Sequence, residues 1–224
     1  MSGKKVQKIE KPKPISELVL ERLRGDIIAN RFALGEKISE AQLSELYGVT
    51  KAPIRTAYIR LEGEGLLTIQ PQSGTFVFHP TVPELRALCE LRIALELEAL
   101  SLALSRNGEL LEKQVDAILK EMAWALDQDN HDFYQQLDTR LHLAIVEHAD
   151  SPLLAETYFG KVNSCFAALR TRFSREQAHN DYSMAEHKTI AESIRNRDSS
   201  QAVRLMREHI DYTEKYYRSL LKDD

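Results

Sequence analysis

The sequence predicts a mainly α-helical protein, with an N-terminal winged helix-turn-helix followed by a C-terminal all-α antiparallel helical bundle. Three observations carry this prediction: short helical patterns joined by a glycine turn, two β-prone runs directly after them, and only amphipathic helical patterns beyond residue 81. A length of 224 residues suits two modest domains. We therefore expect units at residues 15–80 and 81–224, preceded by a flexible basic tail at residues 1–14.

The composition is that of an ordinary globular protein. Hydrophobic residues make up 43% of the chain and charged residues 29%, which is too apolar for a disordered chain. No apolar run approaches the roughly 20 residues of a membrane helix, and the N-terminus lacks the apolar segment of a signal peptide. Two cysteines, Cys89 and Cys165, form no disulfide framework or paired-cysteine metal motif. We expect a cytoplasmic protein without a membrane partner.

Charge is distributed unevenly along the chain. Residues 1–80 hold 12 Lys and Arg against 9 Asp and Glu, whereas residues 81–224 hold 18 against 25. Because residues 1–80 are basic and residues 81–224 are acidic, only the first segment is expected to bind a polyanion.

Two short helices are expected first. Val19, Leu23 and Ile27 recur at a spacing of four, in a pattern that starts at Ile15 and fades at Asn30. A second helix is expected from a capping box, and Gly48 suits the left-handed residue that ends it. This capping box is Ser39 with Gln42, and the buried residues of the second helix are expected to be Leu43 and Leu46.

A third helix is expected directly afterwards, with Thr50 as its cap and Pro53 in its first turn. Its buried stripe is Ile54, Ala57, Tyr58 and Leu61, and its opposite face carries Lys51, Arg55, Thr56 and Arg60. Free N–H groups and the helix dipole favour phosphate at such a helix start. This geometry is typical of a recognition helix in the major groove, although basic solvated faces are also common.

A β-hairpin is expected after the third helix. Residues 66–70 and 75–78 are β-prone runs, and the turn signal Pro71-Gln72-Ser73-Gly74 separates them. Gly74 at the tip would let the backbone approach a sugar or phosphate. The hairpin is either a DNA-contacting wing or a ribbon that only closes the small core.

Residues 15–80 resemble the winged helix-turn-helix of GntR-type bacterial transcription regulators, through the stretch LGEKISEAQLSELYGVTKAPIRTAYIRLEGEGLLTIQPQSGTFV. The resemblance implies DNA contacts at Thr50, Lys51, Ala52, Arg55 and Gly74. Lys51 and Ala41 depart from the pattern, since the family usually has arginine at the first position and often at the second. Because arginine forks to guanine and lysine acts as a point charge, the operator sequence does not transfer from the family.

Beyond residue 81 the patterns predict helices alone, which favours an antiparallel bundle. Helix-stop and N-cap residues separate most of them, as at Asn107-Gly108 and Asp198-Ser199. The expected helices cover residues 82–105, 109–127, 131–149, 152–174, 178–196 and 199–221.

Asp138 and His142 lie one helical turn apart on an apolar face, and His187 and His209 each lie on an apolar stripe of a later helix. A single buried histidine is usually satisfied by a hydrogen bond. Four inward polar groups favour a shared partner, because each unpaired one costs about 1 to 3 kcal/mol. Neutral imidazoles with a carboxylate suit Zn, Ni, Fe or Mn and leave positions for a ligand oxygen. No metal role is expected for His79, His131, His148 and His179, which fall in linkers or at helix ends.

Residues 83–221 are similar to the FadR-type C-terminal ligand-binding domain (FCD) of GntR regulators. The resemblance implies that one divalent metal binds to Asp138, His142, His187 and His209. It also implies that Arg92, in the segment ELRIALE, faces an effector cavity, with Asn163 as a weaker effector contact. The metal set favours the branch that binds small carboxylates over the acyl-CoA branch.

The leading hypothesis is a homodimeric transcription regulator, a repressor and not an enzyme, that binds a double-stranded DNA operator and senses a small organic acid. The alternative is a metal-dependent hydrolase or oxygenase fused to a helix-turn-helix. It would need a general acid or base, for which Glu186 and Tyr134 are candidates, but Glu186 is expected to point away from the stripe of His187. A third hypothesis is a DNA-binding protein whose bundle only dimerises around a structural metal.

Overall fold

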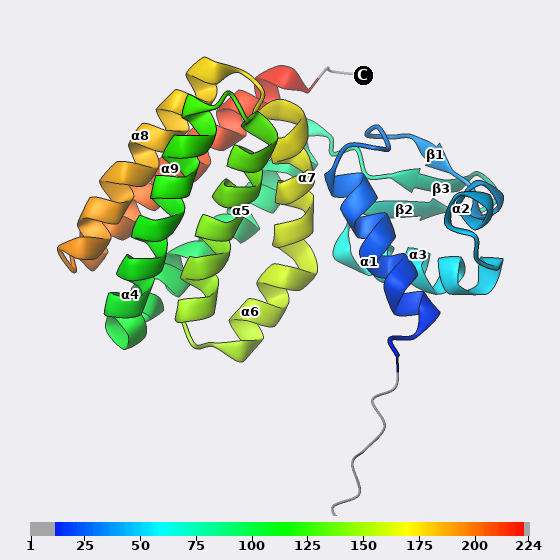
Figure 1. Ribbon diagram of the computed structural model, residues 1–224, viewed down its shortest axis with the longest axis horizontal. Coiled ribbons are helices and arrows are strands. Elements are labelled where there is room, and N and C mark those ends of the chain that lie inside the picture. The colour runs from blue at the N-terminus through cyan, green and yellow to red at the C-terminus, as the bar shows by residue number, and fades with distance from the viewer. Residues whose placement is uncertain (1–11, 222–224) are drawn as a thin grey trace, which may run out of the picture.

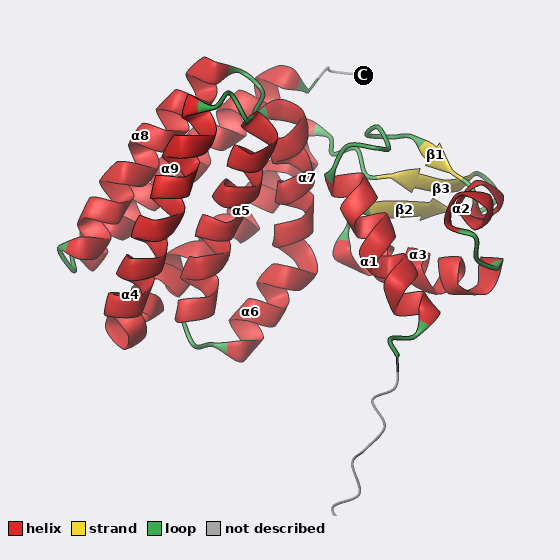
Figure 2. Cartoon of the chain, in the orientation of Figure 1, coloured by secondary structure: helices red, strands yellow, loops and turns green. Residues whose placement is uncertain are grey.

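The computed structural model describes residues 12–221 as two units that lie side by side (Figure 1). The first 11 residues of the expected basic tail lie outside the described residues. The N-terminal unit contains α1 (Ile15–Ile28), β1 (Lys37–Ile38), α2 (Glu40–Tyr47), α3 (Lys51–Glu64), β2 (Leu67–Gln70) and β3 (Gly74–Val77). The helical bundle contains α4 (Val82–Asp127), α5 (His131–His148), α6 (Pro152–Tyr158), the π-helical turn η1 (Phe159–Asn163), α7 (Ser164–Phe173), α8 (Gln177–Arg195) and α9 (Ser199–Leu220). This small sheet among helices confirms the predicted fold class (Figure 2).

The expected helical stripes form the core of the N-terminal unit. The buried members are Val19, Leu23, Ile27, Leu43, Ile54, Ala57, Tyr58 and Leu61. The prediction for Leu46 is wrong, because its side chain is 59% exposed. α2 has only eight residues and buries Leu43 alone, so Leu46 lies at the surface beside the exposed Ile15 and Leu18.

The capping predicted around α2 and α3 is confirmed in part: the Ser39 cap and the Gly48 helix end are present, whereas the described chain shows no return hydrogen bond from the Gln42 side chain to the Ser39 backbone. Ser39 Oγ accepts a hydrogen bond from the Gln42 backbone at 3.1 Å. Gly48 ends α2 with φ at +64°, a left-handed conformation that favours glycine. Thr50 occupies the N-cap position of α3, but its side chain makes no capping hydrogen bond. The sharp turn leaves the first residues of α3 facing solvent.

The sheet has three antiparallel strands in the order β1-β3-β2. The expected hairpin pairs Thr68 of β2 with Phe76 of β3. β1 was not predicted, because a two-residue strand has no readable alternation. Gly74, at the start of β3, has φ at +124°, where a side chain is strained.

The bundle follows the predicted helices with one difference. α4 has non-helical angles at Asn107 (φ −138°, ψ 29°), so its two arms on either side of this residue are the two helices expected over residues 82–105 and 109–127. Asn107 Nδ2 donates to His148 O at 2.8 Å, so the Asn-Gly pair is held against the end of α5 and produces a kink. The helix expected over residues 152–174 is divided by η1, which contains the poor helix former Gly160.

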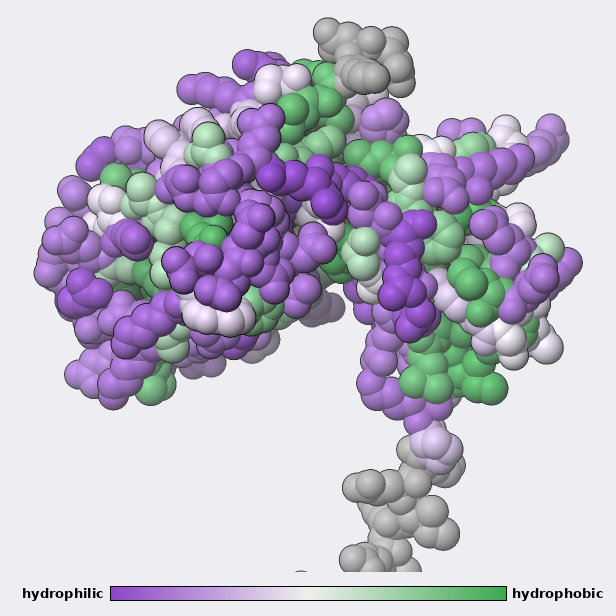
Figure 3. Space-filling view, turned by 45° about the horizontal axis from the view of Figure 1, so that its top comes forward, coloured by the Kyte–Doolittle hydropathy of each residue, from purple (hydrophilic) through white to green (hydrophobic). Residues whose placement is uncertain are grey.

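α4 packs against α5, α8 and α9, and α8 packs against α9. The surface seen in Figure 3 is largely hydrophilic, with hydrophobic residues gathered in places over the N-terminal unit. Over residues 12–221, no helix has the length and apolar character to cross a membrane. The contacts among these helices place the inward faces of α4, α5, α8 and α9 around one interior of the bundle.

Replacing Leu100 of α4 with alanine is expected to lower the free energy of unfolding by about 2 to 5 kcal/mol, because it removes a fully buried side chain and leaves a cavity. Leu110→Ala on the same helix is the control, since Leu110 is 57% exposed, and its effect is expected to stay within about 0.5 kcal/mol. Urea unfolding followed by circular dichroism measures both. Equal effects of the two substitutions would contradict the packing described here.

Candidate functional site

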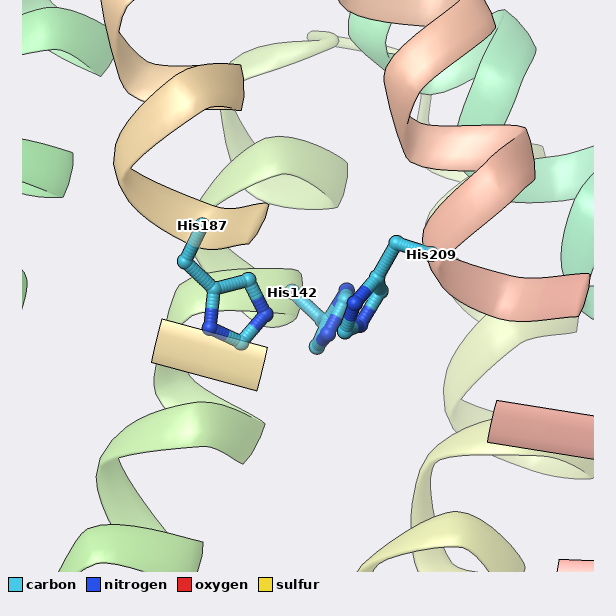
Figure 4. Close-up of side chains that lie close together, drawn as sticks. All are labelled: His142, His187 and His209. Carbon is cyan, nitrogen blue, oxygen red and sulfur yellow. The ribbon is translucent and has the colours of Figure 1, made fainter. Parts of the chain in front are cut away.

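Three of the predicted metal ligands meet in the bundle interior. His142 on α5, His187 on α8 and His209 on α9 offer ring nitrogens that all lie within 4.8 Å of one another. Figure 4 shows the three side chains pointing toward one another from their helices. Each side chain is at most 4% exposed. Three helices that are distant in sequence, α5, α8 and α9, therefore bring their histidines together in the bundle interior.

Asp138, the fourth predicted ligand, lies beside these three histidines but outside the group of ring nitrogens that lie within 4.8 Å of one another. It precedes His142 by one turn of α5, and its Oδ1 lies 3.5 Å from Nε2 of His187. Its Oδ2 lies 3.9 Å from Nε2 of His142. Ligand atoms around one zinc-sized ion lie about 3 to 3.5 Å apart, so a small adjustment brings this carboxylate into the set. The same carboxylate forms an ion pair with Arg170 of α7.

The protonation states of these four groups suit a cation. Burial lowers the pKa of His142 below its usual value and holds the pKa values of His187 and His209 well below it. Burial opposes ionisation of Asp138, but the positive charge of Arg170 lowers the pKa of this carboxyl overall. Neutral imidazoles beside an ionised carboxylate are the forms that bind metals.

His187 gives the clearest test of whether a metal fits. Both of its ring nitrogens are buried, and neither has a hydrogen-bond partner among the described residues. A buried polar atom without a partner costs about 1 to 3 kcal/mol, so a group that accepts its lone pair would remove this cost. The donor set of three imidazoles and one carboxylate therefore fits a divalent transition metal.

Two carboxylates hold the outer nitrogens of these histidines. Glu186 lies 2.8 Å from Nδ1 of His209, and Glu96 lies 2.8 Å from Nδ1 of His142. A histidine that donates Nδ1–H to a carboxylate keeps the Nε2 lone pair for a metal. Burial raises the pKa of Glu186 to about 7. Sequence reasoning placed Glu186 off the stripe of His187 and missed its partner on α9.

Glu96 was not predicted, although it follows Arg92 by one helical turn in the segment singled out for Arg92. Arg92 is fully buried and donates from Nε to Glu96 at 2.7 Å. Its Nη2 lies 2.9 Å from Nε2 of His142, whereas its Nη1 has no partner among the described residues. Tyr158 also donates to Glu96, at 2.7 Å. Arg92 therefore lies inside the bundle, beside the histidine cluster.

A small polar cavity lies beside the cluster. Its lining is Arg92, Tyr134, Gln135, Asp138, Arg170, Ser174, His179, Asn180, Ser183, His209, Thr213 and Tyr217. Its volume is about 10 Å³, the room of one water molecule. Nη2 of Arg170 is buried there without a partner in the described chain. Asn163, the weaker effector candidate, lies on η1 and is not part of this lining.

The other four histidines lie outside the cluster, although His179 lines the cavity beside it. His79 is exposed in the linker, and His131 pairs with Asp129 at 2.9 Å. His148 contacts the Ala144 carbonyl oxygen through Nδ1. His179 is buried at the start of α8 and stacks on Tyr216.

The second predicted site lies on the N-terminal unit. The exposed residues at the start and along the outer face of α3 are Thr50, Lys51, Ala52, Arg55, Thr56 and Arg60, and Gly74 of the hairpin is half-buried. Arg55 pairs with Glu40 of α2 at 2.8 Å, and Arg60 pairs with Glu17 of α1. These two arginines are therefore held in place by carboxylates that a polyanion would have to displace.

Two family matches divide the chain in the same way as the fold. Residues 15–77 match the family described as bacterial regulatory proteins, gntR family. Residues 87–212 match the FCD domain. The first match covers the N-terminal unit and the second contains all four candidate metal ligands.

Relatives of similar length support the match. The HTH-type transcriptional repressor RspR of Escherichia coli (strain K12) is 24% identical over 211 residues, which cover 94% of this chain and 92% of the relative. The HTH-type transcriptional repressor GlaR of the same organism is 28% identical over 200 residues, which cover 84% and 89%. The structure of E. coli McbR/YncC has a TM-score of 0.78 at 16% identity, covers 94% of this chain and 100% of that chain, and shows the same fold.

The FCD match alone covers more than half of the chain, and the GntR match accounts for the unit in front of it. The relatives are named as regulators of transcription and not as enzymes. The chain belongs to the GntR family of bacterial regulatory proteins, with an FCD domain, and is a DNA-binding transcriptional regulator.

Proposed function

We propose that this regulator is a homodimeric, cytoplasmic repressor in which residues 15–80 bind the operator and residues 81–224 bind a metal and a small carboxylate effector. Two relatives, RspR and GlaR, are named as repressors. A dimer suits a single winged helix per chain, because two-fold symmetry then matches a pseudo-palindromic operator. The observation that carries the sensing proposal is the buried cluster of Asp138, His142, His187 and His209.

The metal would be held by those four side chains and would offer open coordination positions to ligand oxygens. Zn, Ni, Fe and Mn all accept this mixture of imidazole and carboxylate. Support comes from the unpartnered nitrogens of His187 and from the two carboxylates that orient His142 and His209. These outer carboxylates are typical of metal-binding histidines.

An anionic effector is supported by two buried guanidinium groups beside the cavity. Arg92 and Arg170 each have one terminal nitrogen without a partner in the described chain. Nη2 of Arg92 now lies 2.9 Å from Nε2 of His142. If this histidine nitrogen binds a metal, Nη2 of Arg92 would lose that partner and would donate to an effector carboxylate instead. Planar guanidinium groups match carboxylates with two parallel hydrogen bonds. We assign this role to Arg92. Asn163 lies outside this lining and stays the weaker effector candidate, with a buried Oδ1 that has no partner in the described chain.

DNA binding is assigned to the exposed residues of α3 and to Gly74. Lys51, Arg55 and Arg60 bring positive charge to this face, and the free N–H groups at the start of α3 favour phosphate. Arg55 and Thr56 lie within the first two turns of α3, the part of a recognition helix that reaches base edges. The hydrolase or oxygenase alternative has no support from the relatives, which are named as regulators.

Metal binding is expected to fail in His187→Ala and in His209→Ala, because each removes one of four ligands. Mass spectrometry of the metal content, on protein purified without chelator, measures the loss. Chelation should also lower the melting temperature of the wild-type protein, since a metal at about 100 times its Kd stabilises by ~2.7 kcal/mol.

His148→Ala is the matched control, because His148 also lies on α5 but its ring hydrogen-bonds the Ala144 carbonyl oxygen and none of the four candidate ligands. It is expected to keep its metal. Full metal occupancy in the His187 and His209 variants would refute the ligand assignment.

Small carboxylates are expected to raise the melting temperature of the metal-loaded protein and to weaken its binding to an operator selected from randomised duplex DNA. The physical reason is that an effector shifts this equilibrium only through contacts that differ between the two states. Mono- and dicarboxylates with and without hydroxyl groups are compared, before and after chelation. If the carboxylates still change operator affinity after the metal is removed, the metal has a structural role only. If none of these acids changes the melting temperature or the operator affinity, the sensing proposal fails and the bundle serves dimerisation.

Arg55→Ala is expected to weaken specific operator binding by about 1 to 3 kcal/mol at fixed salt, because in the proposed complex its guanidinium leaves Glu40 and contacts a base edge. Fluorescence anisotropy with the selected operator measures the change. Arg204→Ala is the control, since Arg204 pairs with Glu208 on α9 and should leave operator affinity unchanged. Unchanged affinity in the Arg55 variant would remove Arg55 from the DNA contacts.

A further inference from the structure

α7 carries arginines on two opposite faces. Arg170 points into the cavity and pairs with Asp138, whereas Arg172 points to the N-terminal unit. Residues two apart on an α-helix are separated by about 200° around its axis, so the two side chains leave the helix on opposite sides. Figure 1 shows α7 at the edge of the bundle that faces α1. A single helix therefore lines the cavity and contacts the neighbouring unit.

Arg172 binds the end of α1. Its Nη2 donates to the Ile27 carbonyl oxygen at 2.9 Å and to the Phe32 carbonyl oxygen at 2.7 Å. The last carbonyl groups of a helix lack partners within the helix and form the negative end of its dipole. A guanidinium at this place satisfies two of the carbonyl groups at the end of α1 and the segment after it.

Arg172 has no carboxylate partner among residues 12–221. It is half-buried, its burial lowers its pKa to about 10, and its other hydrogen bond, from Nη1, goes to the Ala168 carbonyl oxygen on its own helix. A cation held only by carbonyl groups depends on their exact placement. Its contacts across the two units are therefore sensitive to small movements of α7.

The segment before Arg172 binds the end of α3. Lys161 of η1 donates to the Gly63 carbonyl oxygen, and Cys165 of α7 lies with its Sγ 3.5 Å from the Glu64 carbonyl oxygen. Gly65 ends α3 in a left-handed conformation, and a β-carbon there would lie 3.4 Å from the same Sγ. η1 and α7 therefore contact the C-terminal ends of both α1 and α3, and α3 carries the exposed basic face.

We infer that Arg172 is a positioning residue that couples the state of the polar cavity to the placement of α1, against which α3 packs. The inference rests on the proposed function for what the cavity binds. A movement of Arg170 moves α7, and Arg172 carries it to the last turn of α1. This connection is a continuous physical path of one helix and two sets of hydrogen bonds.

Hydrogen–deuterium exchange of the full-length protein tests the coupling at the amide of Asn30, which donates to the Ile27 carbonyl oxygen that Arg172 also binds. Arg172→Met is expected to speed this exchange about tenfold, because the end of α1 opens more often. Arg172→Lys should restore part of the protection. Arg175→Ala should change nothing, since Arg175 donates only to the Thr171 carbonyl oxygen on α7 and lies near Asp132 of α5.

Coupling is then read from two perturbations of the cavity, Arg170→Gln and addition of Zn²⁺ alone. In protein that retains Arg172, each perturbation should change the exchange rate of the Asn30 amide. In the Arg172→Met variant, neither perturbation should change this rate further. Peptides of α5 around His142 report whether each perturbation reached the cavity, and metal content is measured separately. If the protein takes up no Zn²⁺, the proposed metal function fails, while the Arg170→Gln pair still decides the coupling. A response at Asn30 that persists with Arg172→Met, or its absence in wild type while α5 responds, overturns the inference.

Discussion

Buried charge is the constraint on which the bundle depends. Arg92, Glu96, Asp138 and Arg170 are all at most 5% exposed, and a buried charge left without a partner destabilises a fold by several kcal/mol. Each of the four is paired: Arg92 with Glu96 along α4, and Asp138 with Arg170 between α5 and α7. Glu96 also reaches His142 on α5. Three helices must therefore keep their relative positions to satisfy the same charges.

The four candidate metal ligands could be identified from the sequence because each lies on an apolar stripe of its helix. Such a stripe marks an inward face even when the partner is unknown. Glu96 and Arg170 escaped prediction for the opposite reason. A charged residue on a helix is usually solvated, and only the packing of α4 against α5 and of α5 against α7 reveals that these two are enclosed. Glu96 could have been found from its spacing alone, because an acidic residue one helical turn after Arg92 can pair with it.

Local chemistry also explains where the predicted elements succeeded and failed. Gly48 requires no tertiary partner to end α2, so its role could be read directly. Asn107 also reads as a helix stop, and its non-helical angles divide the long α4 into the two arms that were expected. Leu46 reads as a core position by its spacing, yet the eight-residue α2 is too short to bury two leucines.

The small volume of the polar cavity has a kinetic consequence. With room for about one water molecule, it cannot admit a carboxylate of several atoms until side chains such as Arg170 or Tyr217 move. Binding of such a ligand would then follow an opening of the bundle, and the association rate would be set by how often that opening occurs rather than by diffusion. The same closure slows departure, so a ligand held inside would keep the regulator in one state for longer than its affinity alone implies.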